Sequence, residues 1–330
     1  MNWQNRKVLV TGADGFIGSH LLERLVAQGA KVKAFVYYNS FNSWGWLDTL
    51  PRQTLNKVEV FAGDVRDPNG VLKATEKADV VFHLAALIGI PFSYHSPDSY
   101  VDTNIKGTLN ILQAARKNGV KKIVHTSTSE VYGTAQYTPI DETHPINPQS
   151  PYAATKSAAD ELALSFYRSF DLPVTILRPF NTFGPRQSAR AIIPTILSQI
   201  CAGRDTIKLG NMESTRNFNY ISDTIEAFLK IVEADRAVGQ VFNAGSNTEV
   251  SIRELVNLIQ SITKKKIKVI TERGRLRPGK SEVERLVCNA GKLRSVCGWE
   301  SRVSLEQGLK ITLAWLRKNI NRYKTDIYNV

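Results

Sequence analysis

The segment from residue 7 to residue 18 constrains the fold more than any other part of the chain. It begins with a short apolar strand pattern, KVLVT, and runs directly into GADGFIG, a G-x-x-G-x-x-G turn. The residues that follow the turn carry apolar side chains at helical spacing. A strand, a glycine-rich turn and a helix in this order allow backbone N–H groups to approach a pyrophosphate at the helix N-terminus. The segment therefore predicts the first unit of a dinucleotide-binding sheet.

Further apolar runs along the chain predict the other strands of this sheet. They lie at Val32 to Tyr37, Val58 to Ala62, Val80 to Leu84, Ile123 to Thr126, Val174 to Leu177 and Val241 to Ala244. Helical stretches or long connections separate them, which is typical of an α/β fold with a mostly parallel, doubly wound sheet. We expect residues 1–180 to form a Rossmann domain, to which a strand near 241–245 returns. Residues 181–330 are expected to form mainly a smaller C-terminal substrate-binding lobe.

Composition excludes several other classes of protein. The chain has 330 residues, of which 42% are hydrophobic, so it can bury a large core. It has no apolar run of about 18 residues, and a strand pattern begins almost at the N-terminus, so we expect neither a membrane span nor a signal peptide. The cysteines Cys201, Cys288 and Cys297 lack the spacing of metal ligands. We expect a cytoplasmic protein with reduced thiols and no metal.

The net charge of +13 is concentrated in one window. Between Lys264 and Lys280 there are eight basic residues and one acidic residue, Glu272. Such a patch can bind nucleic acid, but the phosphates of a small ligand need cations as well. Arginine suits the second use because its planar guanidinium can hold a phosphate through two hydrogen bonds.

The pair Tyr152 and Lys156 indicates redox chemistry on an alcohol. Residues 152–169 have a helical pattern, so side chains four positions apart share one face. An ammonium group beside a phenol lowers its pKa from about 10 and allows Tyr152 to act as a base. It can then take the alcohol proton while hydride leaves the same carbon for a nicotinamide, with Thr128 bonded to the same oxygen. Glu130 can remove a proton from the neighbouring carbon, which points to elimination on a sugar.

The motifs together resemble those of the extended short-chain dehydrogenase/reductase superfamily, whose members remodel nucleotide-activated sugars. The resemblance rests on the glycine turn, Gly63-Asp64-Val65, His83-Leu84-Ala85-Ala86, Asn104, Thr128, Tyr152 and Lys156, and it extends from about Arg6 to Trp315. The sequence Thr128-Ser129-Glu130 is similar to that of the 4,6-dehydratase branch. Serine at its centre resembles the GDP-mannose enzymes, whereas the dTDP-glucose enzymes have aspartate there. Over its length the chain resembles the bacterial dehydratases that open legionaminic acid synthesis, which act on nucleotide-activated N-acetylglucosamine, usually carried by GDP.

The resemblance implies a nicotinamide cofactor, a nucleotide-sugar substrate and a homodimer, with no nucleic acid or membrane partner. The residues that it assigns to the cofactor are Gly12, Asp14, Gly15, Phe16, Ile17, Gly18, Tyr38, Asn39, Ser40, Asp64, Val65, Leu84, Ala85, Ala86, Asn104, Tyr152 and Lys156. It assigns catalysis to Thr128, Ser129, Glu130, Tyr152 and Lys156, and substrate binding to Asn181, Arg216 and Arg277. The second strand ends with neither an acid for the ribose of NAD nor an arginine for the phosphate of NADP. We expect NAD, with NADP not excluded.

The implied reaction is a 4,6-dehydration, and three alternatives remain open at this point. In the dehydration, C4 is oxidised, Glu130 takes the C5 proton, water leaves from C5 and C6, and hydride returns to C6. The product is a 4-keto-6-deoxy sugar. UDP-glucuronate decarboxylases share Thr-Ser-Glu, and 4-epimerases share every motif except the glutamate. A non-catalytic nucleic-acid-binding or scaffold protein is the third alternative, favoured only by the basic window.

Overall fold

Parallel strands form the central sheet of the computed structural model, which describes residues 1–329. Within these residues the sheet has seven strands in the order β11-β6-β5-β4-β1-β2-β3, and every neighbouring pair is parallel. The strands are β1 (Lys7–Thr11), β2 (Lys31–Tyr37), β3 (Val58–Gly63), β4 (Val80–His83), β5 (Lys122–Thr126), β6 (Val174–Pro179) and β11 (Val241–Ala244). The sequence predicted all of them, because the buried strands of a parallel sheet read as apolar runs, and the partly buried edge strand β3 is also mostly apolar. The doubly wound α/β fold class is confirmed.

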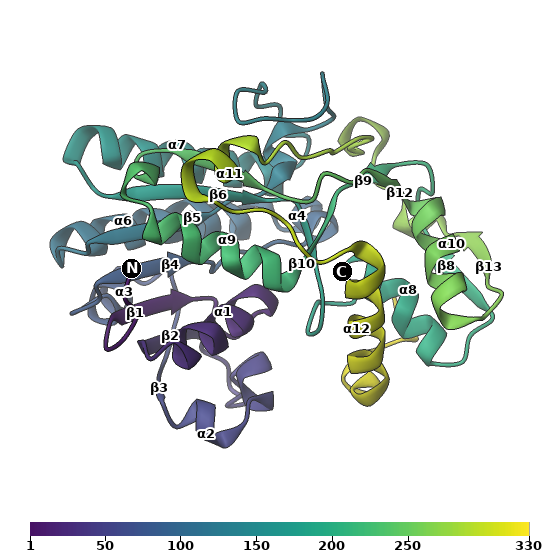
Figure 1. Cartoon of the computed structure of the whole chain (residues 1–330), viewed down its shortest axis with the longest axis horizontal. Helices are drawn as coiled ribbons and strands as arrows, with labels where there is room; N and C mark the ends of the chain where they lie inside the picture. Colours follow the sequence, from purple (N-terminus) through teal and green to yellow (C-terminus); the bar gives the residue numbers. More distant parts are fainter. Residues whose placement is uncertain (330) are drawn as a thin grey trace.

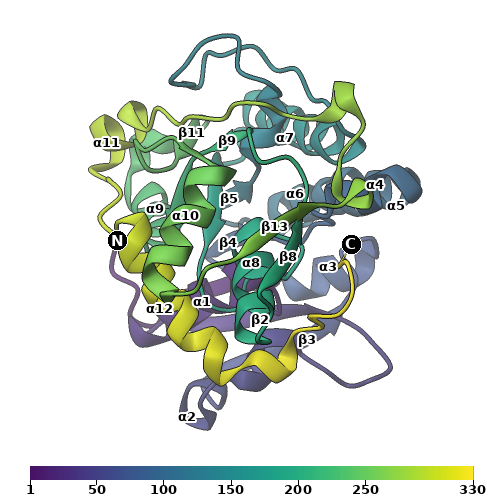
Figure 2. The same cartoon turned by 90° about the vertical axis from the view of Figure 1, so that its right-hand side faces the viewer.

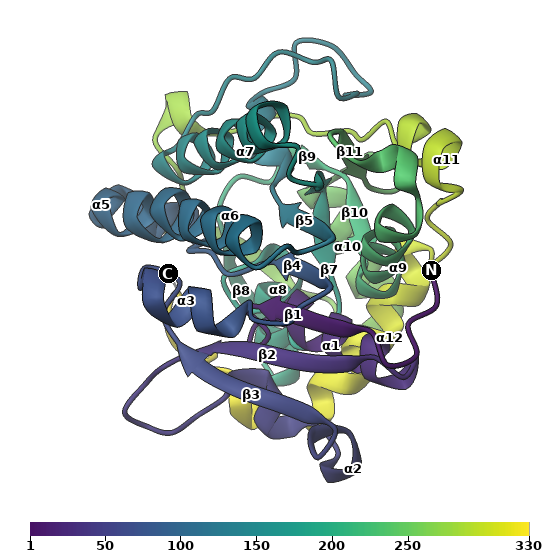
Figure 3. The same ribbon diagram turned by 90° about the vertical axis from the view of Figure 1, so that its left-hand side faces the viewer.

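Helices cover both faces of the sheet (Figure 3). On one face α3 contacts α6 and α6 contacts α7, and on the other α1 contacts α9. Their bounds are α1 (Phe16–Ala27), α3 (Pro68–Ala74), α6 (Gly107–Lys117), α7 (Pro151–Phe170) and α9 (Ile221–Glu233). Each face has its own apolar cluster, and the cluster on the side of α1 and α9 continues into the second half of the chain. Among the helices of residues 1–329, none combines the length and the apolarity that crossing a membrane requires.

Apart from β6, α9 and β11, most of the second half of the chain packs beside one end of the sheet (Figures 1 and 2). Its main helices are α8 (Ile192–Cys201), α10 (Ile252–Thr263) and α12 (Leu305–Lys318), and α12 contacts both of the others. Short strand pairs accompany them: β7 (Asn181–Phe183) with β10 (Phe218–Tyr220), β8 (Thr206–Leu209) with β13 (Lys268–Thr271), and β9 (Thr215–Arg216) with β12 (Val250–Ser251). The remaining α-helices are α2 (Arg52–Leu55), α4 (Ile90–His95), α5 (Pro97–Tyr100) and α11 (Gly291–Cys297). The strand β11 leaves this region and pairs with β6.

A helix cap and a long-range side-chain contact fix two of these elements. Ser251 and Glu254 form a capping box at the start of α10. Asp223 in the first turn of α9 accepts hydrogen bonds from the backbone N–H groups of Arg302 and Val303, both at 2.9 Å. This carboxylate therefore holds the segment that precedes α12 against the first turn of α9.

Candidate active site

The glycine turn between β1 and α1 has the shape that a pyrophosphate requires. Gly12 has a φ of +66°, and a Cβ at this position would lie 2.9 Å from the backbone nitrogen of Ala85. A Cβ on Gly18 would lie 2.1 Å from the carbonyl oxygen of Gly12. The helix α1 begins at Phe16 after Gly15, and within residues 1–329 no side chain caps its N-terminus. Its first N–H groups are therefore open to an anion, as binding a dinucleotide demands.

The ends of β1 and β4 hold the segment after His83 beside this turn. The hydroxyl of Thr11 accepts hydrogen bonds from the N–H groups of Leu84 and Ala85, both at 3.1 Å. His83 lies 2.8 Å from the same hydroxyl and is fully buried, which lowers the pKa of its imidazole well below the usual value. The predicted cofactor residues Leu84, Ala85 and Ala86 thus lie directly opposite the glycine turn.

Asn104 connects this segment to the helix that carries the catalytic pair. It lies in a π-helical stretch, Val101–Lys106, and is buried. Its carboxamide accepts from the N–H of Leu87 at 2.9 Å, donates to the carbonyl of Leu87 at 3.0 Å and donates to the hydroxyl of Thr155 at 3.1 Å. Because Thr155 precedes Lys156, Asn104 fixes α7 relative to the end of β4.

A carboxylate lies at the end of β2 although the strand itself ends without one. Asp14, from the glycine turn, accepts a hydrogen bond from the N–H of Tyr37 at 3.4 Å, and burial raises the pKa of its carboxyl group. The predicted cofactor residues Tyr38, Asn39 and Ser40 follow directly. The sequence pattern could not place Asp14 there, because the contact depends on how the turn folds against the neighbouring strand.

Asp64 and Val65 follow β3 and have different surroundings. Arg66 pairs with the Asp64 carboxylate at 2.5 Å, and its hydrogen bonds hold the pKa of Asp64 below the usual value. Val65 is buried against Gly107, where a Cβ would lie 2.9 Å from a Val65 methyl carbon. Asp64 therefore retains a neighbouring cation, and Val65 packs against the start of α6.

The catalytic residues predicted from the sequence come from the turn after β5 and from the first turns of α7. Thr128 precedes the 3₁₀ turn Ser129–Tyr132, and its hydroxyl accepts from the N–H of Glu130 at 3.2 Å. Ser129 is buried within this turn. Ser150 caps α7 by accepting from the N–H of Ala153 at 3.2 Å, which places Tyr152 in the first turn of that helix. Two short segments thus bring the threonine, the glutamate and the tyrosine together.

The surroundings of Tyr152 raise the pKa of its phenol. Burial is the largest cause, a hydrogen bond with Thr128 acts in the opposite direction, and the charge of Glu130 adds to the increase. The sequence predicted a lowered pKa because of Lys156, and for the chain by itself this was wrong. The phenol loses its contact with water, and this loss outweighs the favourable neighbours. In the chain alone Tyr152 is therefore a neutral phenol.

Lys156 is buried one turn further along the same helix. Burial lowers the pKa of its ammonium from 10.5 to about 8, and the charge of Asp160 acts against the decrease. Asp160 is itself held by Arg178 at 3.0 Å and by the hydroxyl of Ser127 at 2.8 Å. Lys156 therefore remains a cation at neutral pH, but less strongly than an exposed lysine does.

This burial predicts a pH-dependent cost in stability. The folded chain binds the Lys156 proton more weakly than the unfolded chain does, so the cost is complete below about pH 8 and disappears as the pH rises towards 10.5. Lys156→Met removes the titrating group. We expect the stability of the wild type relative to this variant to increase by about 2 kcal/mol between pH 7 and pH 10. Urea unfolding of both proteins at both pH values measures this change. A stability difference between them that is the same at pH 7 and pH 10 would contradict the lowered pKa of Lys156.

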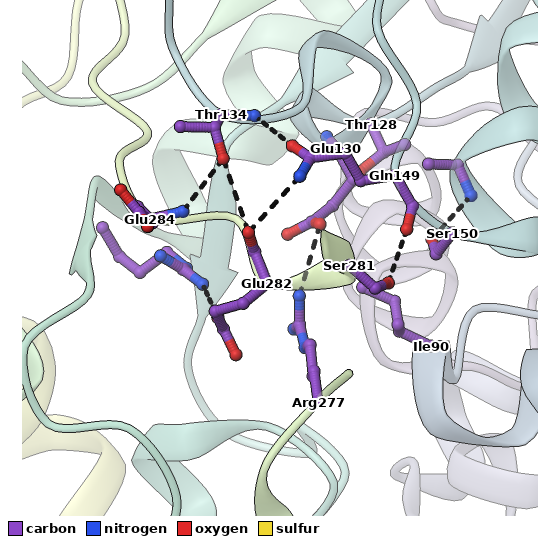
Figure 4. A network of polar contacts seen from close by, with 12 residues as sticks. Ile90, Thr128, Glu130, Thr134, Gln149, Ser150, Arg277, Ser281, Glu282 and Glu284 are labelled. Carbon is purple, nitrogen blue, oxygen red and sulfur yellow. Dashed lines mark hydrogen bonds and ion pairs between the residues drawn. The ribbon is translucent and has the colours of Figure 1, made fainter. Parts of the chain in front are cut away.

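Of the predicted substrate residues, Arg277 points toward Glu130 (Figure 4). A guanidinium nitrogen of Arg277 lies 3.5 Å from the Glu130 carboxylate, and Arg216 pairs with Glu282 at 3.2 Å. Burial tends to lower the pKa of Arg277, but the charges of Glu130 and Glu282 outweigh it and raise the pKa. Within residues 1–329 the buried side-chain nitrogen of Asn181 has no hydrogen-bond partner. These donors are suited to the oxygens of a diphosphate.

Glu282 and its neighbour Gln149 were missed by the sequence analysis. Glu282 pairs with Arg216, and the side chain of Gln149 bridges two loops of the site. Neither residue belongs to a recognisable motif, and both act through contacts between distant parts of the chain. Only the position of Gln149 directly before the cap of α7 could have drawn attention to it.

Comparisons with known proteins agree with this architecture. The model of a family described as GDP-mannose 4,6 dehydratase matches residues 9–312. A UDP-N-acetyl-alpha-D-glucosaminuronate decarboxylase from Bacillus cytotoxicus is 34% identical over 325 residues, covering 95% of this chain and 98% of the relative. A UDP-glucose 4-epimerase from Mycolicibacterium smegmatis is 35% identical over 318 residues, covering 94% and 98%.

A solved structure adds a relative with a third activity and a bound cofactor. It is the dTDP-glucose 4,6-dehydratase from Streptomyces venezuelae with NAD bound, and it is 28% identical to this chain. The TM-score is 0.85, and the similarity covers 96% of this chain and 99% of the other. From its motifs, its sheet and these matches, the chain belongs to the extended short-chain dehydrogenase/reductase family of nucleotide-sugar dehydratases, epimerases and decarboxylases, within the group described as GDP-mannose 4,6 dehydratase.

Proposed function

We propose that this chain is a nucleotide-sugar 4,6-dehydratase, which forms a 4-keto-6-deoxy sugar. The observation that carries the proposal is the position of Glu130. Its carboxylate lies in the same buried site as Thr128 and Tyr152 and is 3.5 Å from Arg277, a candidate ligand of the substrate diphosphate. A 4-epimerase needs no additional carboxylate beside its tyrosine, whereas elimination needs a base for the proton on C5.

The cofactor is NAD. When bound, it would supply the redox chemistry for C4 and C6 of the sugar. The glycine turn fits its pyrophosphate, because the N-terminus of α1 is open and the turn is closely packed. We assign the selection of NAD over NADP to Asp14, since a carboxylate at the end of β2 repels the 2′-phosphate of NADP.

The protein groups divide the proton transfers between them. In the complex, the positive charge of oxidised NAD would add to that of Lys156 and oppose the burial that raises the phenol pKa in the chain alone. Tyr152 then acts as phenolate and takes the proton of the sugar 4-hydroxyl, with Thr128 bonded to the same oxygen. The resulting 4-ketone acidifies the hydrogen on C5, and Glu130 removes it. The protonated Glu130 then delivers a proton to the departing C6 hydroxyl, so that water leaves and the carboxylate is restored. Return of hydride to C6 would leave an enolate that takes a proton from solvent at C5, and Tyr152 releases the 4-hydroxyl proton to solvent, which closes the cycle. We assign Ser129 an orienting hydrogen bond, because a hydroxyl is a weaker acid than a carboxyl group.

The substrate that we propose is GDP- or UDP-N-acetylglucosamine. Arg216, Arg277 and Asn181 would hold its diphosphate, which explains why part of the basic window lies inside the site. We further propose that the enzyme acts as a homodimer in the bacterial cytoplasm and supplies surface-sugar synthesis, with residues 181–330 contributing most of the substrate-binding lobe.

Incubation with a panel of sugar nucleotides tests the proposal. The panel consists of GDP-, UDP- and dTDP-linked glucose, mannose and N-acetylglucosamine, together with UDP-glucuronate. We expect mass spectrometry to find the loss of one water from an N-acetylglucosamine nucleotide, with no net change in added NAD. Loss of carbon dioxide from UDP-glucuronate, or a product of unchanged mass with inverted C4, would overturn the dehydratase assignment.

Decarboxylation is the second candidate function, because the decarboxylase from Bacillus cytotoxicus matches almost the whole chain. It begins with the same oxidation at C4, and the ketone then makes a C6 carboxylate prone to leave as carbon dioxide. UDP-N-acetylglucosaminuronate, tested beside the UDP-glucuronate of the panel, decides between the two reactions through the loss of carbon dioxide.

A further inference from the structure

Gln149 lies where three parts of the active site meet (Figure 4). It directly precedes Ser150, the cap of the helix that carries Tyr152. Its side chain is half-buried, and both ends of its carboxamide are engaged within the described residues. Glutamine can accept at its oxygen and donate through two N–H groups, so one side chain is able to connect a donor on one loop with acceptors on another.

The first contact of Gln149 is with the loop that follows Glu130. The N–H of Thr134 donates to the Gln149 side-chain oxygen at 2.5 Å. Gly133, between Glu130 and this contact, has a φ of +65°, and a Cβ on it would lie 2.2 Å from the carbonyl oxygen of Asn147. The loop is therefore closely packed against the residues before Gln149, and its backbone has little freedom at the point where the hydrogen bond holds it.

The second set of contacts is with the loop that carries Arg277. The side-chain nitrogen of Gln149 donates to the carbonyls of Lys280 and Glu282, at 2.9 and 3.4 Å. The hydroxyl of Ser281 donates in return to the backbone carbonyl of Gln149 at 2.5 Å and lies 2.7 Å from the hydroxyl of Tyr94. These bonds fix the segment between Arg277 and Glu282, each of which pairs with a charged group of the site.

We propose that Gln149 is a positioning residue that holds the Glu130 loop, the Arg277 loop and the start of α7 in a fixed relation. The inference deepens the proposed function, because it explains how a diphosphate held by Arg277 places the sugar against Glu130 and Tyr152. Gln149 itself contacts none of the reacting atoms. It acts through the 3.5 Å spacing between Glu130 and Arg277, which depends on both loops at once.

Two variants distinguish the contact made by the oxygen of the Gln149 carboxamide from the contacts made by its nitrogen. Gln149→Glu retains an acceptor for the N–H of Thr134 but cannot donate to Lys280 and Glu282, whereas Gln149→Met has similar length and loses both contacts. Gln260→Met is the matched control. Gln260 lies on α10, outside the site, and its side-chain oxygen accepts a hydrogen bond from the N–H of Ile267 at 2.8 Å. Amide hydrogen exchange, the affinity for GDP and UDP, and steady-state kinetics with GDP- and UDP-N-acetylglucosamine are measured for all three.

The two variants have distinct expected results. In Gln149→Met we expect the amides of residues 131–134 and 278–284 to exchange about tenfold faster or more, with a lower kcat and weaker nucleotide binding. In Gln149→Glu only the 278–284 segment should loosen, so KM and the nucleotide dissociation constant rise by several-fold while kcat changes less. Gln260→Met should match the wild type in all three measurements. Because exchange and nucleotide affinity require no turnover, they test Gln149 even if the dehydratase assignment fails.

Two results would overturn the inference. One is a Gln149→Met protein in which exchange in either loop stays within about twofold of the wild type, since a single hydrogen bond should slow exchange by more than that. The other is a Gln149→Glu protein that loosens the Thr134 loop as much as Gln149→Met does, because the retained acceptor would then be irrelevant.

Discussion

The Glu130→Gln enzyme should oxidise the substrate at C4 but fail to release water. Glutamine keeps the size and polarity of the side chain and cannot accept the C5 proton, so we expect dehydration to fall by about 10³-fold, within the usual range for loss of a general base. Oxidation at C4 depends on Tyr152 and Thr128 and should persist. Single-turnover experiments would show reduced nicotinamide accumulating without the loss of water in the mass spectrum.

Glu284→Gln is the matched control for this variant. Glu284 is exposed and contacts the neighbouring segments through its backbone: its N–H donates to the hydroxyl of Thr134 at 3.3 Å, and its carbonyl accepts from the N–H of Thr215 at 2.9 Å. The control should therefore dehydrate the substrate at the wild-type rate. Full dehydration by Glu130→Gln would show that Glu130 is not the base for the C5 proton. Only the proposed oxidation at C4 would then stand.

The Tyr152→Phe enzyme should lose both halves of the reaction. The ring of Tyr152 packs at 79° to Tyr100 with centroids 6.3 Å apart, and phenylalanine preserves this packing, so the variant should fold. Without the hydroxyl, no group takes the proton of the 4-hydroxyl, and we expect turnover to fall by about 10²- to 10⁴-fold. No reduced nicotinamide should accumulate, which distinguishes this variant from Glu130→Gln.

Tyr137→Phe provides the control for the loss of a phenol. Tyr137 is exposed and donates to Asp141 at 3.0 Å, away from the catalytic residues. The turnover rate of Tyr137→Phe should equal that of the wild type. Substantial C4 oxidation by Tyr152→Phe would mean that another group serves as the base.

The sequence predicted the fold well for a physical reason. The inner strands of the central sheet, such as β4 and β6, are buried on both faces, so their side chains must be apolar, and the glycine turn must lack Cβ atoms to pack against Ala85. Such requirements are local and remain visible in a linear pattern. The capping box at Ser251 and Glu254 is local in the same way.

The parts that the sequence could not predict depend on long-range contacts. The approach of Asp14 to the end of β2 joins residues 23 positions apart, and the contact of Gln149 with Lys280 joins residues 131 positions apart. The pKa of Tyr152 was misjudged for a related reason, since helical spacing reveals the neighbouring Lys156 but not how completely the fold removes water from the ring. Motif and spacing therefore predict which residues gather, and packing determines their electrostatic state.

The most direct test of the proposed mechanism follows deuterium from C4 of the substrate. GDP- and UDP-N-acetylglucosamine labelled at C4 are incubated with the enzyme, and the product is examined by mass spectrometry and NMR. If the C4 ketone is formed and the same hydride is returned after water has left, the deuterium will be found on C6 of a 4-keto-6-deoxy product. Deuterium that returns to C4 of a product still containing its C6 hydroxyl would contradict the dehydratase account and identify an epimerase.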